Sequence, residues 1–254
     1  MTDALPGTRR RASLAREQGV TAMSDKTDKR KTGPLATPIT ILITGLVTAA
    51  IQFGLGIWGW GGWSAFFAHP AFQALAWMVL FFIIVATFSG SSGLSSGRTE
   101  DKSNRWVLVA FLLIALAGAY FSAYTDRIGF WTVGGDAMRW AGLFVCAAGC
   151  ALRLIPVFVL KNRFSGLVAI QAGHKLETRG IYGLVRNPSY LGMLVSVVGW
   201  ALVFRSIVGV LISLLSLIPI IPRIHAEERL LRKHFGTQYD DYFARTWRLL
   251  PWIY

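Results

Sequence analysis

The sequence predicts an all-α protein, a multi-pass transmembrane helical bundle of about six spans with the last two forming a short hairpin. Of its 254 residues 54% are hydrophobic and only 15% are charged, whereas a soluble domain has about a quarter charged residues. The charges form clusters, and the apolar stretches between them are long enough to cross a bilayer. The net charge of +13 is then explained by basic cytoplasmic loops and anionic lipid headgroups, without nucleic acid as a partner.

Three parts follow one another along the chain. Residues 1–37 are polar and lack apolar periodicity, which predicts a disordered cytoplasmic tail. Residues 38–160 predict four N-terminal transmembrane helices, and residues 161–254 a loop, a helical hairpin and a C-terminal interfacial helix with its tail. The four expected helices are 38–60, 71–88, 106–124 and 137–160, the last interrupted by Pro156.

The apolar block from Tyr190 to Pro222 is too long for one ordinary crossing, and Arg205 lies near its middle. Two short helices that turn at Phe204, Arg205 and Ser206 fit it best. Beyond Arg223 the pattern becomes amphipathic, and Gly236 is expected to end this C-terminal helix.

The distribution of basic residues predicts the orientation. With six spans and a cytoplasmic N-terminus, the cytoplasmic segments hold twenty-two Lys and Arg residues, and the outer loops hold only Arg127 and Arg205. Such a bias is typical of membrane proteins. Both termini are therefore expected in the cytoplasm, and the compact six-span form favours the bacterial inner membrane over the endoplasmic reticulum.

Two arginines and two cysteines lie within the fourth expected helix. Arg139 is near its outer end and is expected to snorkel towards water. Arg153 is two turns inside the inner end, where it either pairs with another helix or contacts a headgroup or carboxylate. Cys146 and Cys150 are one turn apart and are expected to pack as small residues against a neighbouring helix. The four histidines are too few and too widely spaced to predict a metal site.

Two polar segments beside the apolar runs predict a site at one membrane face. In the first, His174 to Tyr190, Gly180 permits a tight turn and Pro188 can begin a helix. His174, Tyr182, Asn187 and Tyr190 would then point into a cavity, although a basic connecting loop with structural aromatic residues explains the pattern equally well.

The second segment, Arg223 to Glu228, lies directly after an apolar span. Arg223 and Glu227 are four residues apart and can pair on one helical face, while Glu228 points about 100° away and can reach Arg232. Each pair alone is more often a structural salt bridge. Their position beside the basic loop favours a functional role.

Together these residues resemble the isoprenylcysteine carboxyl methyltransferase family, with its phospholipid methyltransferase relatives. The resemblance rests on H-x-L-x-T-x-G-x-Y-x-x-V-R-x-P-x-Y-x-G from His174 to Gly192 and R-x-x-x-E-E from Arg223 to Glu228. F-G-x-x-Y-x-x-Y from Phe235 to Tyr242 and R-L-L-P from Arg248 to Pro251 extend it. It covers the last third of the chain, and the first 160 residues match only as a bundle of spans.

The resemblance implies that S-adenosyl-L-methionine binds in a pocket facing the cytoplasm, and that a lipidic acceptor or prenylated peptide enters from the bilayer. Arg223 and Glu227 would be the catalytic residues, with Arg223 facing the acceptor carboxylate. The implied cofactor contacts are His174, Lys175, Leu176, Glu177, Tyr182, Asn187, Pro188, Ser189, Tyr190 and Glu227.

The resemblance implies O-methylation of the carboxylate of a prenylated cysteine or a similar lipidic acid. A phospholipid N-methyltransferase, a non-catalytic membrane protein and an NADPH-dependent membrane reductase are the alternatives. One departure bears on the choice, because Asn187 stands where the family usually has His. An amide cannot shuttle a proton, and Asn187 therefore favours an acid over an amine acceptor.

Overall fold

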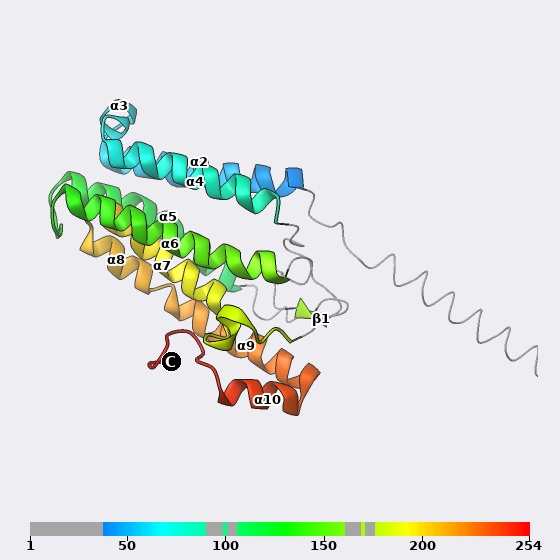
Figure 1. Ribbon diagram of the computed structural model, residues 1–254. Helices are drawn as coiled ribbons and strands as arrows, with labels where there is room; N and C mark the ends of the chain where they lie inside the picture. The colour runs from blue at the N-terminus through cyan, green and yellow to red at the C-terminus, as the bar shows by residue number, and fades with distance from the viewer. Residues whose placement is uncertain (1–37, 90–98, 101–105, 161–168, 171–175) are drawn as a thin grey trace, which may run out of the picture. The chain divides into compact units, whose positions relative to one another are not determined.

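The computed structural model describes residues 38–89, 99–100, 106–160, 169–170 and 176–254. The predicted tail at 1–37 and much of the two long connecting loops lie outside these residues. The described chain is almost entirely helical (Figure 1), as the sequence predicts. One pair of two-residue strands was not expected: β1 (Thr99–Glu100) pairs antiparallel with β2 (Ala169–Ile170).

The first four long helices have nearly the predicted boundaries. They are α2 (Pro38–Trp60), α4 (Pro70–Thr87), α5 (Trp106–Arg127) and α6 (Asp136–Leu160), and the short α3 (Trp63–Phe67) connects α2 to α4. Pro70 occupies the first turn of α4, where a missing N–H costs no helical hydrogen bond. The predicted interruption at Pro156 is wrong, because α6 continues through this proline to Leu160.

The predicted hairpin is confirmed. Helix α7 (Pro188–Val203) ends at the predicted turn, and α8 (Ile207–Leu214) begins directly after it. Ser206 caps α8 by accepting a hydrogen bond from Gly209 N at 2.8 Å. Helix α9 (Leu217–Phe235) follows after a short break, and Gly236, with a φ of 57°, ends it as predicted.

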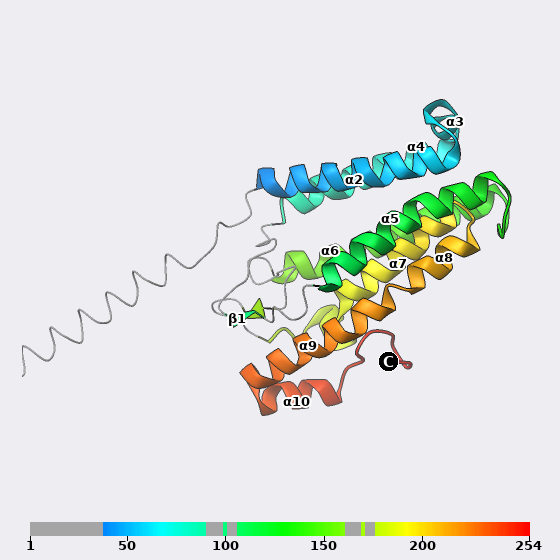
Figure 2. The ribbon, with the colours of Figure 1, turned by 180° about the vertical axis from the view of Figure 1, so that it is seen from behind.

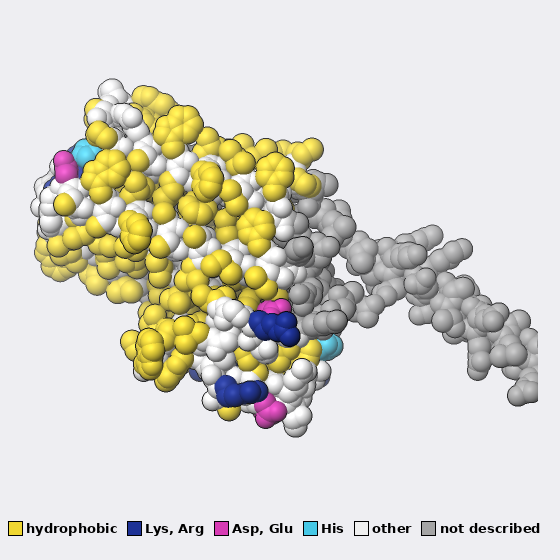
Figure 3. Space-filling model, in the orientation of Figure 1, with side chains coloured by type: hydrophobic (Ala, Val, Ile, Leu, Met, Phe, Trp, Pro, Cys, Tyr) yellow, Lys and Arg dark blue, Asp and Glu magenta, His cyan; other side chains and the backbone are white. Residues whose placement is uncertain are grey.

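Within the residues that the structure describes, five segments are long and apolar enough to cross a membrane: α2, α4, α5, α6 and the combined α8–α9 segment from Ile207 to Phe235. Helix α7 is apolar but has only 16 residues, which corresponds to a length of about 24 Å. Hydrophobic side chains cover the helices on the face shown in Figure 3. Large apolar residues such as Ile39, Trp77, Phe81 and Phe144 are exposed, as expected for surfaces that face lipid.

The closest helix packing joins α6 to α7. A Cβ atom added at Gly149 would overlap the backbone nitrogen of Ser196, and one added at Gly199 would overlap that of Cys146. Small residues at such positions allow two backbones to approach. Cys146 is a buried free thiol in this interface, which confirms its predicted packing role.

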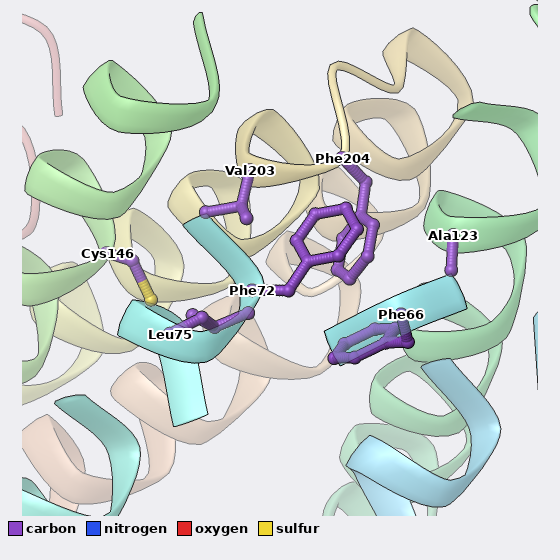
Figure 4. Packing of buried hydrophobic residues seen from close by; sticks show 7 residues of the cluster. All are labelled: Phe66, Phe72, Leu75, Ala123, Cys146, Val203 and Phe204. Carbon is purple, nitrogen blue, oxygen red and sulfur yellow. The ribbon is translucent and has the colours of Figure 1, made fainter. Parts of the chain in front are cut away.

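One hydrophobic cluster lies where α3, α4, α5, α6 and α7 meet (Figure 4). It contains Phe66, Phe72, Leu75, Ala123, Cys146, Val203 and Phe204. We call this end of the bundle, which includes the turns at 60–70, 127–136 and 203–207, the far end. The phenyl rings of Phe66 and Phe72 stack with centroids 4.7 Å apart, and Phe204 lies 4.8 Å from Phe72. These rings fix α3 and α4 against the α7–α8 turn.

A buried ion network lies beside this cluster. The carboxylate of Asp126 in α5 has no exposed surface and accepts hydrogen bonds from Arg139 in α6 and from Arg205 in the turn, the latter at 2.7 Å. Arg139 also donates to Val203 O at 3.1 Å. The prediction that Arg139 snorkels is therefore wrong: its side chain is 4% exposed because Asp126 provides a counter-ion inside the bundle.

The opposite end holds α10 (Thr237–Ala244) and the C-terminal segment. Helix α10 folds back beside α9, and the chain then returns towards α8 (Figures 1 and 2). A second cluster, formed by Leu194, Ile220, Ile224 and Leu249, holds α7, α9 and the tail together. We call this the site end.

Replacing Asp126 tests whether the far-end network supports the fold. Asp126→Asn leaves two guanidinium groups without their shared counter-ion, and the free energy of unfolding should fall by about 3–5 kcal/mol. Thermal unfolding in detergent micelles measures the change. The matched control is Asp136→Asn, which alters a carboxylate that also pairs with Arg139 but is 74% exposed and should change stability little. Equal melting temperatures for the two variants would contradict the role of Asp126.

Candidate functional site

Two segments far apart in the sequence meet at the site end. In the first, a 3-10 helix (Gly180–Gly183) leads into an extended stretch and then into α7. Gly180 has a φ of 58° and Pro188 stands in the first turn of α7, and both features confirm the sequence prediction. Trp247 of the tail runs parallel to Val185, with Arg186 N donating to Trp247 O at 2.8 Å.

Tyr190 of α7 joins this loop to α9. Its hydroxyl donates to a carboxylate oxygen of Glu227 and accepts from Arg223 Nε at 2.5 Å. Arg223 Nε also lies 3.5 Å from Glu227 Oε1, as their spacing predicts. Arg223 is buried and Glu227 is partly exposed. The predicted approach of the two polar segments is confirmed by these contacts.

Glu228 forms a second ion cluster directly behind the first. It accepts from Arg186 Nε at 3.2 Å and from Arg248 Nε at 3.0 Å. The predicted pairing of Glu228 with Arg232 is wrong, because Arg232 pairs with Asp240 of α10 at 2.6 Å. Arg186 of the loop and Arg248 of the tail pair with Glu228 instead, and tertiary folding brings them to it.

The same cluster fixes the tail in place. Arg186 donates to the carbonyl oxygens of Phe243 and Thr246, and its guanidinium lies 4.1 Å from the centre of the Phe243 ring. Asn187 Nδ2 donates to Arg248 O at 2.8 Å. These bonds link the residues just before α7 to the segment that follows α10.

Aromatic hydroxyls complete the attachment. Tyr242 donates to Tyr182 O at 2.8 Å, and burial raises the pKa of Tyr242, so this phenol stays a neutral donor. Tyr254 accepts from Arg248 Nη1 at 2.9 Å and lies 3.0 Å from His225 Nε2. These hydrogen bonds join the loop to α10 and the C-terminal tail to α9.

The remaining predicted cofactor residues are placed as follows. His174 and Lys175 lie outside the described residues. Leu176 and Glu177 are half-buried at the start of the described loop, and Glu177 accepts from Arg179 N at 3.2 Å. Ser189 is half-buried, and its carbonyl oxygen lies 3.4 Å from Arg153 Nη1 of α6. The geometry brings Tyr182, Asn187, Pro188, Ser189, Tyr190, Arg223 and Glu227 into one region of the molecule.

Two residues that organise the site received no role from the sequence. Arg186 and Arg248 both lie within the quoted motifs, V-R-x-P and R-L-L-P. The available signal was charge balance: two adjacent glutamates at the end of an apolar span require two sets of cationic partners. Arg223 pairs with Glu227, and the two motif arginines are the natural partners of Glu228.

The chemistry open to this arrangement is binding and orientation. Arg223 Nε contacts both the Tyr190 hydroxyl and Glu227 Oε1, so the guanidinium has a defined direction. Glu227 and the tyrosine rings offer a carboxylate and π faces to a cationic ligand. In the described part of the chain, no three His, Cys, Asp or Glu side chains are grouped to hold a metal.

Comparison with known proteins yields consistent matches. The phospholipid methyltransferase family matches residues 137–238. A probable protein-S-isoprenylcysteine O-methyltransferase of Oryza sativa subsp. indica is 27% identical over 196 residues, which cover 72% of this chain and 99% of that protein. The protein-S-isoprenylcysteine O-methyltransferase of Schizosaccharomyces pombe is 28% identical over 87% of this chain and 99% of its own length.

The fold also matches a solved structure. The eukaryotic intramembrane Ras methyltransferase ICMT superimposes with a TM-score of 0.54 at 19% identity, over 94% of this chain and 86% of that one. The similarity extends well beyond the last third, to which the motifs are confined. The four N-terminal helices are thus part of the shared fold.

Replacing Glu228 tests whether it holds the loop and tail on α9. Glu228→Gln leaves Arg186 and Arg248 without a counter-ion, and the free energy of unfolding should fall by about 3 kcal/mol. Limited proteolysis should then cut the tail after Arg245 faster than in the wild type. The control is Asp240→Asn, which breaks an ion pair whose side chains are about half exposed and should leave both measurements unchanged. A tail that stays resistant in Glu228→Gln would contradict this role.

Proposed function

We propose, on the premise that this chain is a relative of the isoprenylcysteine carboxyl methyltransferases and the phospholipid methyltransferases, that it is an integral-membrane S-adenosylmethionine-dependent O-methyltransferase. Its acceptor is the carboxylate of a prenylated cysteine or a similar lipidic acid. The observation that carries the proposal is the fixed position of Arg223, whose Nε contacts both Tyr190 and Glu227 where the apolar part of α9 ends.

The residues proposed for the donor site can be compared with the chemistry of the donor. S-adenosylmethionine, when bound, supplies a methyl group on a positively charged sulfonium. Glu227 and the tyrosines at positions 182 and 190 match such a cation, through a carboxylate and aromatic rings. His174 to Glu177 would hold the remainder of the donor. The residues present therefore fit the group, and the protein provides placement while the donor provides the reactive carbon.

The acceptor needs alignment more than activation. A carboxylate is already ionised at pH 7, so no base has to remove a proton before its oxygen attacks the methyl carbon. Arg223 would bind the carboxylate and hold it in line with the bond that breaks, and the packed tail would keep water away. With the donor bound, the products would be the methyl ester of the acceptor and S-adenosylhomocysteine, in which sulfur retains the electron pair of the broken bond.

Asn187 supports an acid acceptor over the amine of a phospholipid. An amine must lose a proton on methylation, and the residue found here at the family's usual histidine position is an amide engaged with Arg248 O. The matched relatives whose names give an activity are methyltransferases. Nothing in these matches favours a reductase or a non-catalytic protein.

The placement in the membrane extends the proposal. The basic residues of the loop and of α9 support a site at the cytoplasmic face, with both termini on that side. Residues 161–254 would then carry donor and acceptor binding, and the four helices within 38–160 would form the scaffold in the bilayer. A bacterial inner membrane fits the compact form, and the acceptor would reach Arg223 from the lipid.

Methyl labelling tests the function. Purified protein in lipid vesicles receives S-adenosylmethionine with a labelled methyl group, together with N-acetyl-S-farnesylcysteine or phosphatidylethanolamine. We expect label in the farnesylcysteine ester. Label in phosphatidylethanolamine alone would assign the phospholipid activity. Calorimetry tests for a reductase and for a non-catalytic protein: binding of NADPH in place of S-adenosylhomocysteine indicates the first, and binding of neither indicates the second.

Arg223→Ala tests the acceptor role. Removing a charged hydrogen-bonding partner should lower turnover about a hundredfold, while the affinity for S-adenosylhomocysteine should change less than threefold. Arg229→Ala is the matched control, because Arg229 lies on the same helix and is exposed. Loss of S-adenosylhomocysteine binding in a folded Arg223→Ala protein would place this residue in the donor site instead.

A further inference from the structure

Arg153 lies inside the spanning helix α6, and neither the sequence nor the proposed mechanism gives it a definite role. It lies on α6, seven residues before the helix ends at Leu160. Its Nη1 is 3.4 Å from Ser189 O, a long contact next to Tyr190. The backbones are fixed there, because a Cβ atom added at Gly192 of α7 would overlap Arg153 N. The guanidinium is thus held beside the start of α7.

The charge environment of Arg153 differs from that of its counterparts. Arg139 and Arg205 share Asp126, and Arg223 has Glu227. Among the residues that the structure describes, no carboxylate lies within ion-pair distance of Arg153, and its side chain is exposed. A cation at this depth in a bilayer is costly unless an anion accompanies it.

Arg153 also lies beside the site already described. Its Nη1 contacts the carbonyl oxygen of Ser189, the residue directly before Tyr190, whose hydroxyl is bonded to Arg223 and Glu227. Two guanidinium groups therefore flank Tyr190, and Glu227 is the carboxylate hydrogen-bonded to this tyrosine. Before an acceptor binds, this group has an excess of positive charge, which is complementary to an anion.

We propose that Arg153 is a second acceptor-binding residue, which together with Arg223 holds the carboxylate of the lipidic acid and gives the enzyme its preference for an anionic acceptor. The inference rests on the proposed function and deepens it. Arg223 would approach the carboxylate from α9 and Arg153 from α6, so the acceptor would be fixed between two helices. A neutral amide, or the positively charged amine of a phospholipid, would gain no ionic contact from either guanidinium group.

The test compares an acid with its uncharged analogue. N-acetyl-S-farnesylcysteine is the acceptor, and the corresponding carboxamide is a competitive inhibitor that differs only at the acceptor group. In Arg153→Gln the KM of the acid should rise about ten- to a hundredfold, the range expected for a lost hydrogen bond to a charged group. The inhibition constant of the carboxamide and the affinity for S-adenosylhomocysteine should change less than threefold.

Two further variants make the result specific. Arg127→Gln removes a positive charge from the far end of α5 and should leave the KM of the acid unchanged. Arg153→Lys keeps the charge and should retain most of the preference for acid over carboxamide, even if Arg153→Gln does not fold. An acid-to-carboxamide ratio that stays at the wild-type value in the folded glutamine variant would overturn the proposal. If the glutamine variant does not fold, Arg153→Met, which also removes the charge but keeps an unbranched side chain, replaces it, and a wild-type ratio in that variant would overturn the proposal.

A lipid phosphate could also supply the anion, and vesicle composition distinguishes this source. If Arg153→Gln lowers stability only in phosphatidylglycerol vesicles and leaves the acid-to-carboxamide ratio unchanged, Arg153 binds lipid and the proposal is overturned. Failure of the proposed function has a different signature, because the wild-type protein would then methylate no farnesylcysteine at all. An active wild type with an unaffected Arg153→Gln variant rejects this inference alone.

Discussion

A charge inside a hydrocarbon layer needs a partner of opposite sign, and this constraint organises both ends of the bundle. At the far end Asp126 holds Arg139 and Arg205 and so joins α5, α6 and the α7–α8 turn. At the site end Glu228 holds Arg186 and Arg248 and so joins the loop, α9 and the tail. Between these two clusters the packing depends on small residues, above all the glycines of α6 and α7.

The candidate site uses the same interactions for a different purpose. The cluster at Glu228 is closed within the protein, whereas the neighbouring group of Tyr190, Arg223 and Glu227 includes a partly exposed carboxylate. A fully paired cluster stabilises the fold, whereas Glu227, the residue directly before Glu228 on the same helix, would present its carboxylate to a ligand under the proposed function. We propose that the adjacent glutamates in R-x-x-x-E-E divide the two tasks, with Glu227 binding the ligand and Glu228 holding the structure.

The sequence predicted the long helices well, because the lengths of the hydrophobic stretches determine the bounds of these helices. The turn at Arg205 divides the last stretch into two. It also predicted the approach of Tyr190 to Glu227, through motif resemblance and the distribution of basic residues. It did not predict the true partners of Arg139 and Glu228, since these come from helices and loops distant along the chain. Spacing along one helix identifies local pairs such as Arg223 and Glu227, and tertiary folding decides the others.

We propose that the loop before α7 and the start of the polar part of α9 form one donor site at one membrane face. Hydrogen–deuterium exchange of the protein in lipid vesicles, with and without saturating S-adenosylhomocysteine, tests it most directly. We expect the ligand to protect peptides covering 176–190 and peptides covering 220–230, while peptides from α2 exchange at the same rate with and without it. Protection of only one of these two segments, or of neither, would contradict it.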